Sequence, residues 1–94
     1  MKLYLISYNL KLKATFDYTP LFNYIERLSS EWFHGIPDLY IIETSVDKES
    51  ILSGMKSFIS KIDSILIFEL NDNVAISQHG LTPEGIHWLS TRFK

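Results

Sequence analysis

Three segments of this chain are apolar on both of the faces that a β-strand presents. In residues 2–10, leucines alternate with tyrosines and isoleucine, so neither set of alternate side chains is mainly polar. Residues 39–44 and 64–70 show a similar pattern. A strand that is apolar on both faces belongs in a sheet whose two sides are both covered. These segments therefore predict a sheet that needs a protein layer on each side.

Two stretches between these strands have the spacing of amphipathic helices. The first begins at Thr19 and Pro20, because threonine is a favoured N-cap residue and proline is favoured at the first helical position. It ends near residues 29–30, and its apolar stripe consists of Leu21, Phe22, Ile25 and Leu28. The second helix is capped by Ser45 or Asp47, and its stripe consists of Ile51, Leu52, Met55, Phe58, Ile59 and Ile62.

A β-hairpin is predicted between these two helices. Residues 31–34 are short and aromatic, and residues 35–38 (GIPD) are typical of a turn. We expect residues 31–34 to be the first arm, at the edge of the sheet, and residues 39–44 to be the second arm.

Small additions are predicted after the last apolar strand. Residues 71–73 (NDN) are typical of a turn, and residues 74–76 could pair as a short extra strand. Thr82 and Pro83 then repeat the helix-start signal. The short C-terminal helix that follows has an apolar stripe of Ile86, Leu89 and Phe93.

The predicted order is strand, helix, strand, strand, helix, strand, with a short C-terminal helix. Right-handed connections arrange this order as a single α+β domain, residues 1–94, with the ferredoxin-like βαββαβ fold. Its antiparallel sheet is ordered fourth, first, third, second, with both main helices on one face, and Lys2 lies within reach of Glu43 or Glu69. The other face must be covered by the C-terminal helix, a second subunit or both, so we expect a homodimer.

Charge and composition exclude several classes of function. The net charge is −2 at pH 7, whereas a nucleic-acid-binding domain usually has a basic face and a pI above about 9. The clustered basic residues are Lys11 and Lys13 in one loop and Arg92 and Lys94 in the tail. The chain has no cysteine, which excludes disulfides, thiolate metal sites and a cysteine nucleophile. We expect no signal peptide, no membrane span and a cytoplasmic location.

Several short motifs resemble one family of small proteins. Residues 5–10 (LISYNL) are similar to the opening strand of proteins described as SinR-like. Residues 32–34 (WFH), 40–44 (YIIET), 63–70 (DSILIFEL) and 87–89 (HWL) resemble further motifs of that group, and together the motifs span nearly the whole chain. The group belongs to the ferredoxin-like superfamily of the CRISPR-associated Cas-two nucleases and the VapD toxins.

The resemblance implies a homodimer of ferredoxin-like subunits. In the nuclease branch it also implies metal-assisted phosphodiester cleavage that depends on an aspartate at the end of the first strand. Asn9 occupies that position here. An amide oxygen can contact a hard cation but brings no negative charge, so two facing amides are a poor substitute for two carboxylates. We therefore expect neither a bound metal or cofactor nor metal-dependent nuclease activity.

The candidate site that the residues can build lies around Asn9. Asp38 and Asp63 begin strands that run antiparallel to the first strand, so both should lie near Asn9. Their alternative role is confined to the turns at the strand ends. His34 is a further candidate, because a histidine paired with a carboxylate can act as a general acid–base in metal-free RNA cleavage. The simpler interpretation of His34 is an exposed histidine with a local hydrogen bond.

Three functions remain open. The leading hypothesis is a non-catalytic dimeric module of the Cas-two or VapD type that acts through protein or nucleic-acid contacts. The first alternative is an endoribonuclease or toxin-like nuclease at the dimer cleft, and the second is a structural dimerisation partner for another protein. The acidic composition favours the first and third of these, and Asn9 argues against the metal-dependent form of the nuclease.

Overall fold

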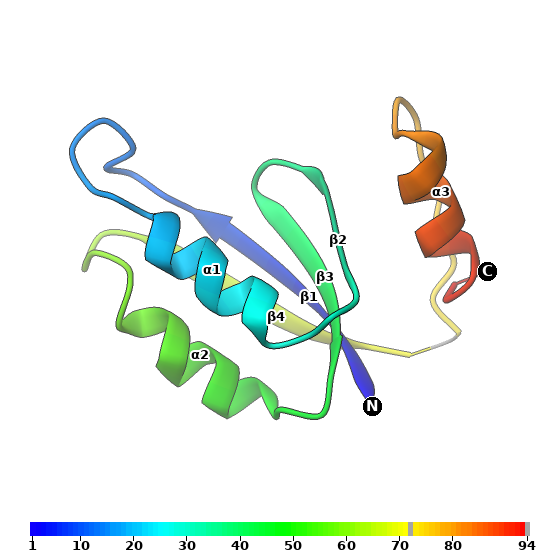
Figure 1. The fold of residues 1–94 in the computed structure, drawn as a ribbon, viewed down its shortest axis with the longest axis horizontal. Helices are drawn as coiled ribbons and strands as arrows, with labels where there is room; N and C mark the ends of the chain where they lie inside the picture. The colour runs from blue at the N-terminus through cyan, green and yellow to red at the C-terminus, as the bar shows by residue number, and fades with distance from the viewer. Residues whose placement is uncertain (72, 94) are drawn as a thin grey trace.

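A four-stranded antiparallel sheet forms the centre of the fold (Figure 1). Along the chain, the elements are β1 (Lys2–Asn9), α1 (Thr19–Arg27), β2 (Trp32–Ile36), β3 (Leu39–Thr44), α2 (Lys48–Lys56), β4 (Ser64–Leu70) and α3 (Pro83–Ser90). β1 pairs with β3 on one side and with β4 on the other, and β2 pairs with β3. The sheet order is therefore β2-β3-β1-β4, which reads β4-β1-β3-β2 from the opposite edge.

The computed structural model describes residues 1–71 and 73–93. The predicted turn at 71–73 contains one residue, Asp72, outside this range, and Lys94 of the predicted basic tail also lies outside it. Within the described residues, no helix combines the length and the apolar composition that a membrane crossing needs.

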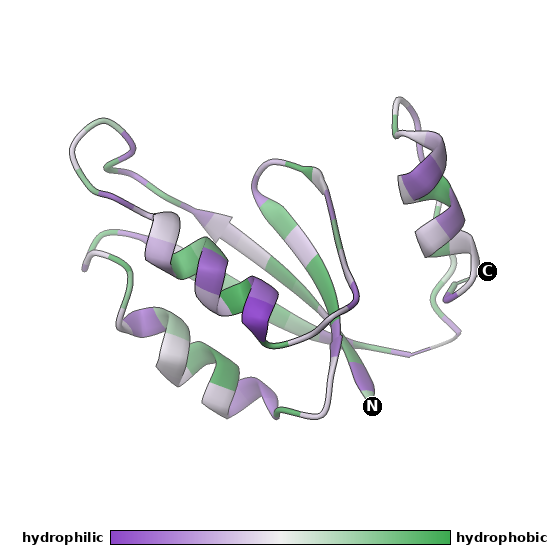
Figure 2. Cartoon of the chain, viewed as in Figure 1, coloured by the Kyte–Doolittle hydropathy of each residue, from purple (hydrophilic) through white to green (hydrophobic). Residues whose placement is uncertain are grey.

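The main hydrophobic core lies between the sheet and the helices α1 and α2, which cover one face of the sheet (Figure 1). Figure 2 shows hydrophobic residues along the strands and alternating hydrophobic and hydrophilic residues along both helices. This α+β arrangement is compatible with a ferredoxin-like fold. The fully buried members of the core are Tyr4, Ile6, Leu21, Ile25, Tyr40, Ile42, Ile51 and Met55.

The opposite face of the sheet is covered only in part. A second cluster forms where α3 and the segment before it meet β2 and β3, and its buried residues are Phe33, Ile41, Leu89 and Phe93. Arg92 follows α3: its guanidinium lies 4.0 Å from the centre of the Trp88 ring and 3.4 Å from the Glu31 carboxylate before β2. This cover lies over the β2–β3 side and leaves part of the β1–β4 side open.

The predicted position of Lys2 is confirmed. Its Nζ lies 3.6 Å from Glu69 Oε1, at the end of the sheet where β1 begins and β4 ends. Both side chains are well exposed, so the ion pair contributes only about 0–1 kcal/mol. The contact follows from the β1–β4 register, which also decides which side chains share each face.

The helix starts were predicted with mixed success. Thr19 is not the N-cap of α1 as predicted: Tyr18 is, and its carbonyl accepts the first helical hydrogen bonds. The Asp17 carboxylate accepts the Thr19 N–H at 3.0 Å, which starts the helix one residue earlier. Of the two caps predicted for α2, Ser45 and Asp47, the structure shows Asp47, whose side chain accepts the Ser50 N–H at 2.8 Å. The predicted cap of α3, Thr82, is confirmed.

Three predicted elements differ from the structure: the second helix, the extra strand at 74–76 and the first arm of the hairpin. The stripe assigned to α2 ran to Ile62, but α2 ends at Lys56. The Asp63 carboxylate accepts the Ser60 N–H at 2.8 Å, and this turn leads the chain away from the helix axis into β4. Residues 74–76 do not form the predicted strand; Val74 and Ile76 instead pack against the second cluster. The first hairpin arm is β2, longer than the predicted 31–34 and irregular between Phe33 and Ile36.

Gly54 lies within α2 because a side chain of α1 occupies the space beside it. A Cβ atom at position 54 would overlap the Tyr24 hydroxyl and would lie 2.9 Å from Tyr24 Cε1. The Tyr24 ring also packs against Phe58, with ring centroids 5.6 Å apart, so moving it away would cost that contact. Glycine at this position therefore allows α1 and α2 to approach each other.

This packing predicts the effect of adding a methyl group. We expect Gly54→Ala to lower the free energy of unfolding by about 1–3 kcal/mol, because Tyr24 must be displaced. In a Tyr24→Ala background, the same substitution should raise it by about 1 kcal/mol, because alanine is the better helix former and the obstruction is gone. Urea unfolding of the four proteins measures both effects, and a stabilising Gly54→Ala in the natural protein would contradict the packing.

Candidate functional site

The structure places the predicted site residues at the end of β1. Asn9 is exposed and lies directly opposite Ser64, the first residue of β4. Asp63 therefore precedes the residue that pairs with Asn9. On the other side, the carbonyl of Asp38 accepts the Tyr8 N–H at 3.2 Å. The chain segments that carry Asp38 and Asp63 thus flank the end of β1.

The carboxylate of Asp63 is fully engaged in joining three segments of the chain. Its Oδ1 accepts the Lys11 N–H at 2.8 Å, and its Oδ2 accepts the Tyr18 hydroxyl at 2.7 Å and the Ser60 N–H at 2.8 Å. Burial raises the pKa of the Asp63 carboxyl, but these hydrogen bonds outweigh it and hold the pKa below its usual range. This carboxylate orders the loop after β1, which is the turn role considered for it from the sequence.

Asp38 has a different and weaker partner. Its Oδ1 lies 3.4 Å from the Nζ of Lys13, and both side chains are exposed. An exposed ion pair of this kind contributes little to stability. Within residues 1–71 and 73–93, no three His, Cys, Asp or Glu side chains lie close enough together to hold a metal ion.

His34 lies against an aromatic side chain and has a backbone partner. Its Nδ1 is 2.7 Å from the carbonyl of Leu39, and its ring stacks on Tyr40 at a centroid distance of 3.8 Å. A carbonyl can only accept, so Nδ1 carries the proton and Nε2 is the acceptor of the neutral ring. The hydrogen bond to Leu39 is the local interaction considered for this histidine from the sequence.

Two tyrosines beside these residues were not identified from the sequence. The Tyr40 hydroxyl donates to Glu26 Oε2 at 2.5 Å, and the Tyr8 hydroxyl donates to the carbonyl of Pro37 at 2.7 Å. Burial raises the pKa of both hydroxyls. The negative charge of Asp38 raises the pKa of Tyr8 further, and the hydrogen bond to Glu26 raises the pKa of Tyr40 further. Both phenols therefore stay protonated at neutral pH and act as hydrogen-bond donors. Their positions in apolar strands gave no signal of these partners.

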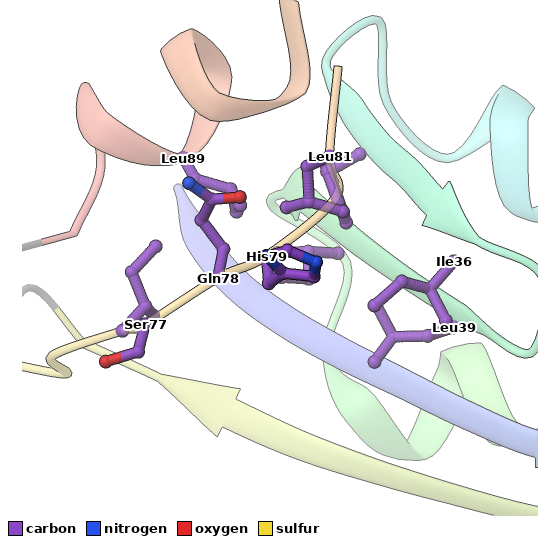
Figure 3. Close-up of a pocket in the computed structure, with 10 residues that line it drawn as sticks. Ile36, Leu39, Ser77, Gln78, His79, Leu81 and Leu89 are labelled. Carbon is purple, nitrogen blue, oxygen red and sulfur yellow. The ribbon is translucent and has the colours of Figure 1, made fainter. Parts of the chain in front are cut away.

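A small apolar cavity lies between the C-terminal segment and the β2–β3 hairpin. Its volume is about 270 Å³. Figure 3 shows Leu81 and Leu89 on one side of it, and Ile36 and Leu39 on the other. Its polar lining comes from the exposed segment of Ser77, Gln78 and His79. This lining offers apolar contact but no charged carboxylate, lysine or arginine that would fix the orientation of a polar substrate.

A second candidate feature is an apolar surface on β1 and β4, on the face away from α1 and α2. In the β1–β4 register Leu5 is opposite Phe68 and Ser7 is opposite Leu66, and directly opposite residues share a face. We call these four residues the open patch. Its exposed members are Leu66 and Phe68, whereas Leu5 and Ser7 are partly buried and Leu5 packs against the second cluster. Leu66 is 56% exposed and Phe68 is 51% exposed. None of the four side chains is charged, so the patch suits contact with another apolar protein surface.

The open patch thus differs from the surroundings of Asn9, where the carboxylates of Asp38 and Asp63 already have partners within the chain. The open patch can therefore form contacts with another protein surface. Comparison of the chain with protein-family models, with curated proteins and with solved structures found no match.

Proposed function

We propose that this protein is a cytoplasmic, non-catalytic homodimeric module of the type that the Cas-two and VapD resemblance implies, and that copies meet through β4 and the open patch. The observation that supports this most is the exposure of Leu66 and Phe68, which are more than half exposed on a regular strand. Large apolar side chains that are adjacent and exposed commonly mark protein interaction sites.

Charge favours a protein partner over a nucleic acid for this surface. Phosphate backbones are bound by lysine and arginine side chains, and the open patch has none. The Lys13 side chain, in the loop after β1, is instead paired with Asp38. The three hydrogen bonds of the Asp63 carboxylate argue against its acting as a catalytic base.

The proposal predicts the mass of the protein in solution. We expect light scattering at micromolar concentration to give twice the chain mass of 10.9 kDa. The double variant Leu66→Ser/Phe68→Ser should remain folded and give the mass of one chain, because a specific interface of at least about 1,000 Å² cannot form without its apolar centre.

A matched control distinguishes a specific interface at this surface from nonspecific hydrophobic association. Ile36 is 46% exposed at the opposite edge of the sheet, in β2. Ile36→Ser removes a comparable apolar side chain, and we expect it to leave the dimer intact. A single-chain mass for the natural protein would overturn the proposed function, as would dissociation by Ile36→Ser but not by the double variant.

A further inference from the structure

The two edges of the sheet are protected to very different degrees. At β2, the pairing with β3 is interrupted between Phe33 and Ile36, and a proline follows the strand. The helix α3 also packs alongside β2, with the ring centroids of Trp88 and Phe33 6.2 Å apart. Irregular pairing, proline and covering elements are the means by which proteins prevent edge strands from pairing with other chains. The β2 edge therefore has the features of an edge that stays unpaired.

β4 has none of these features. It pairs with β1 over seven consecutive residues without a register shift, and it contains no proline. Its one charged residue, Glu69, is already paired with Lys2 of the same chain. β4 is an edge strand of the sheet, so the backbone donors and acceptors along its outer side have no neighbouring strand among residues 1–71 and 73–93.

A groove follows this free edge. Its volume is about 260 Å³, and it is lined by Lys48, Glu49 and Leu52 of α2 and by Ile65, Leu66 and Ile67 of β4. Consecutive strand residues point to opposite faces, so a groove lined by all three of these β4 residues reaches around the outer side of the strand. The β4 side of the groove is apolar, and the two charged residues on its α2 side, Lys48 and Glu49, are paired with each other. A partner strand of the same composition can therefore lie along β4 without facing an unpaired charge there.

We propose that β4 pairs antiparallel with β4 of a second copy about a two-fold axis at Ile67, which joins the two sheets into one. This inference rests on the proposed self-association and specifies its geometry. Ile67 is the midpoint of β4, so this register uses the whole strand. Leu66 then lies opposite Phe68 of the second copy, so these exposed side chains contact each other across the new strand pair.

The neighbouring registers are less favourable. A two-fold axis perpendicular to the sheet pairs residues that share a face. An axis at Leu66 would place Glu69 opposite Asp63 of the second copy, and like charges directly opposite are destabilising. An axis at Phe68 would leave Ser64 and Ile65 outside the pairing. The axis at Ile67 avoids both problems, which commits the pairing to one register.

Single cysteine substitutions test this register. The natural chain has no cysteine, so every disulfide that forms must come from the introduced residues. Residues directly opposite each other in an antiparallel pair have Cα atoms about 4.5–5.5 Å apart, within the range of about 4.4–6.8 Å that a disulfide spans. We expect Ile67→Cys to form a cross-linked dimer. We also expect an equimolar mixture of Leu66→Cys and Phe68→Cys to cross-link far more than either variant alone, and this mixture provides an independent readout if Ile67→Cys folds poorly.

The outcomes separate the register from the dimer itself. The alternative is a dimer in which the open patches pack face to face. In that dimer Leu66→Cys and Phe68→Cys would each cross-link alone, and Ile67→Cys would not, because residue 67 points toward the helices. This result would overturn the edge pairing but keep the dimer. A dimer that none of these cysteines cross-links also overturns it. A single-chain mass in light scattering overturns the proposed function as well.

Discussion

Replacing Ile42 by alanine should lower the free energy of unfolding by about 2–5 kcal/mol, a large share of the 5–15 kcal/mol typical of a whole domain. Ile42 is fully buried in β3, where it lies opposite Tyr4 of β1. It belongs to the main core that joins the sheet to α1 and α2. Truncation leaves a cavity that neither layer can close without disturbing the other, so the entire domain should be destabilised.

Urea unfolding followed by far-UV circular dichroism measures this loss. The matched control is Ile62→Ala, which removes the same atoms from a side chain that is 57% exposed, and a change within about 0.5 kcal/mol is expected there. Equal effects of the two substitutions would contradict the position of the core between the sheet and the two helices.

Replacing Phe93 by alanine should have a large effect confined to the C-terminal part. Phe93 is buried in the second cluster with Leu89, Phe33 and Ile41. Truncating a buried phenylalanine costs about 3–5 kcal/mol, and the remaining contacts of α3, such as the partly exposed ion pair of Arg92 with Glu31, are too weak to compensate. We expect α3 to detach while the main core stays folded.

Amide hydrogen exchange resolves this local opening. Protection should fall in residues 83–93 and remain high in the central strand β1. Ile86→Ala serves as the control, because Ile86 lies on the same helix but is not part of the buried cluster. A uniform loss of protection over the described chain would instead show that the two clusters unfold as one unit.

Local patterns in the sequence were sufficient to predict most of the fold. The strands apolar on both faces are β1, β3 and β4, and the caps Asp47 and Thr82 follow from side-chain chemistry. The end of α2 could not be predicted, because the helical spacing continues past Lys56 although Asp63 closes a turn there. The segment at 74–76 alternates like a strand, yet its side chains are used to cover the second cluster.

The candidate site was predicted less completely, because its chemistry depends on contacts between distant segments. Antiparallel order was enough to place Asp38 and Asp63 at the end of β1. The hydrogen bond from Tyr18 to the Asp63 carboxylate depends on loop geometry that no spacing reveals. The stacking of His34 on Tyr40 depends on the register of the irregular β2–β3 pairing, which the sequence does not show. Likewise, the sequence indicates only that Gly54 is a poor helix former. Its packing role depends on Tyr24 of α1, which lies beside it in the structure.

Hydrogen exchange along β4 tests most directly whether this strand is an interface. In a strand that pairs only with β1, alternate backbone amides face solvent and exchange fast. We predict that NMR will show protection at every amide of residues 65–69 in the natural protein, with loss of protection at alternate residues in Leu66→Ser/Phe68→Ser. Fast exchange at alternate amides of β4 in the natural protein, unchanged by concentration, would contradict the pairing of β4 with a second copy.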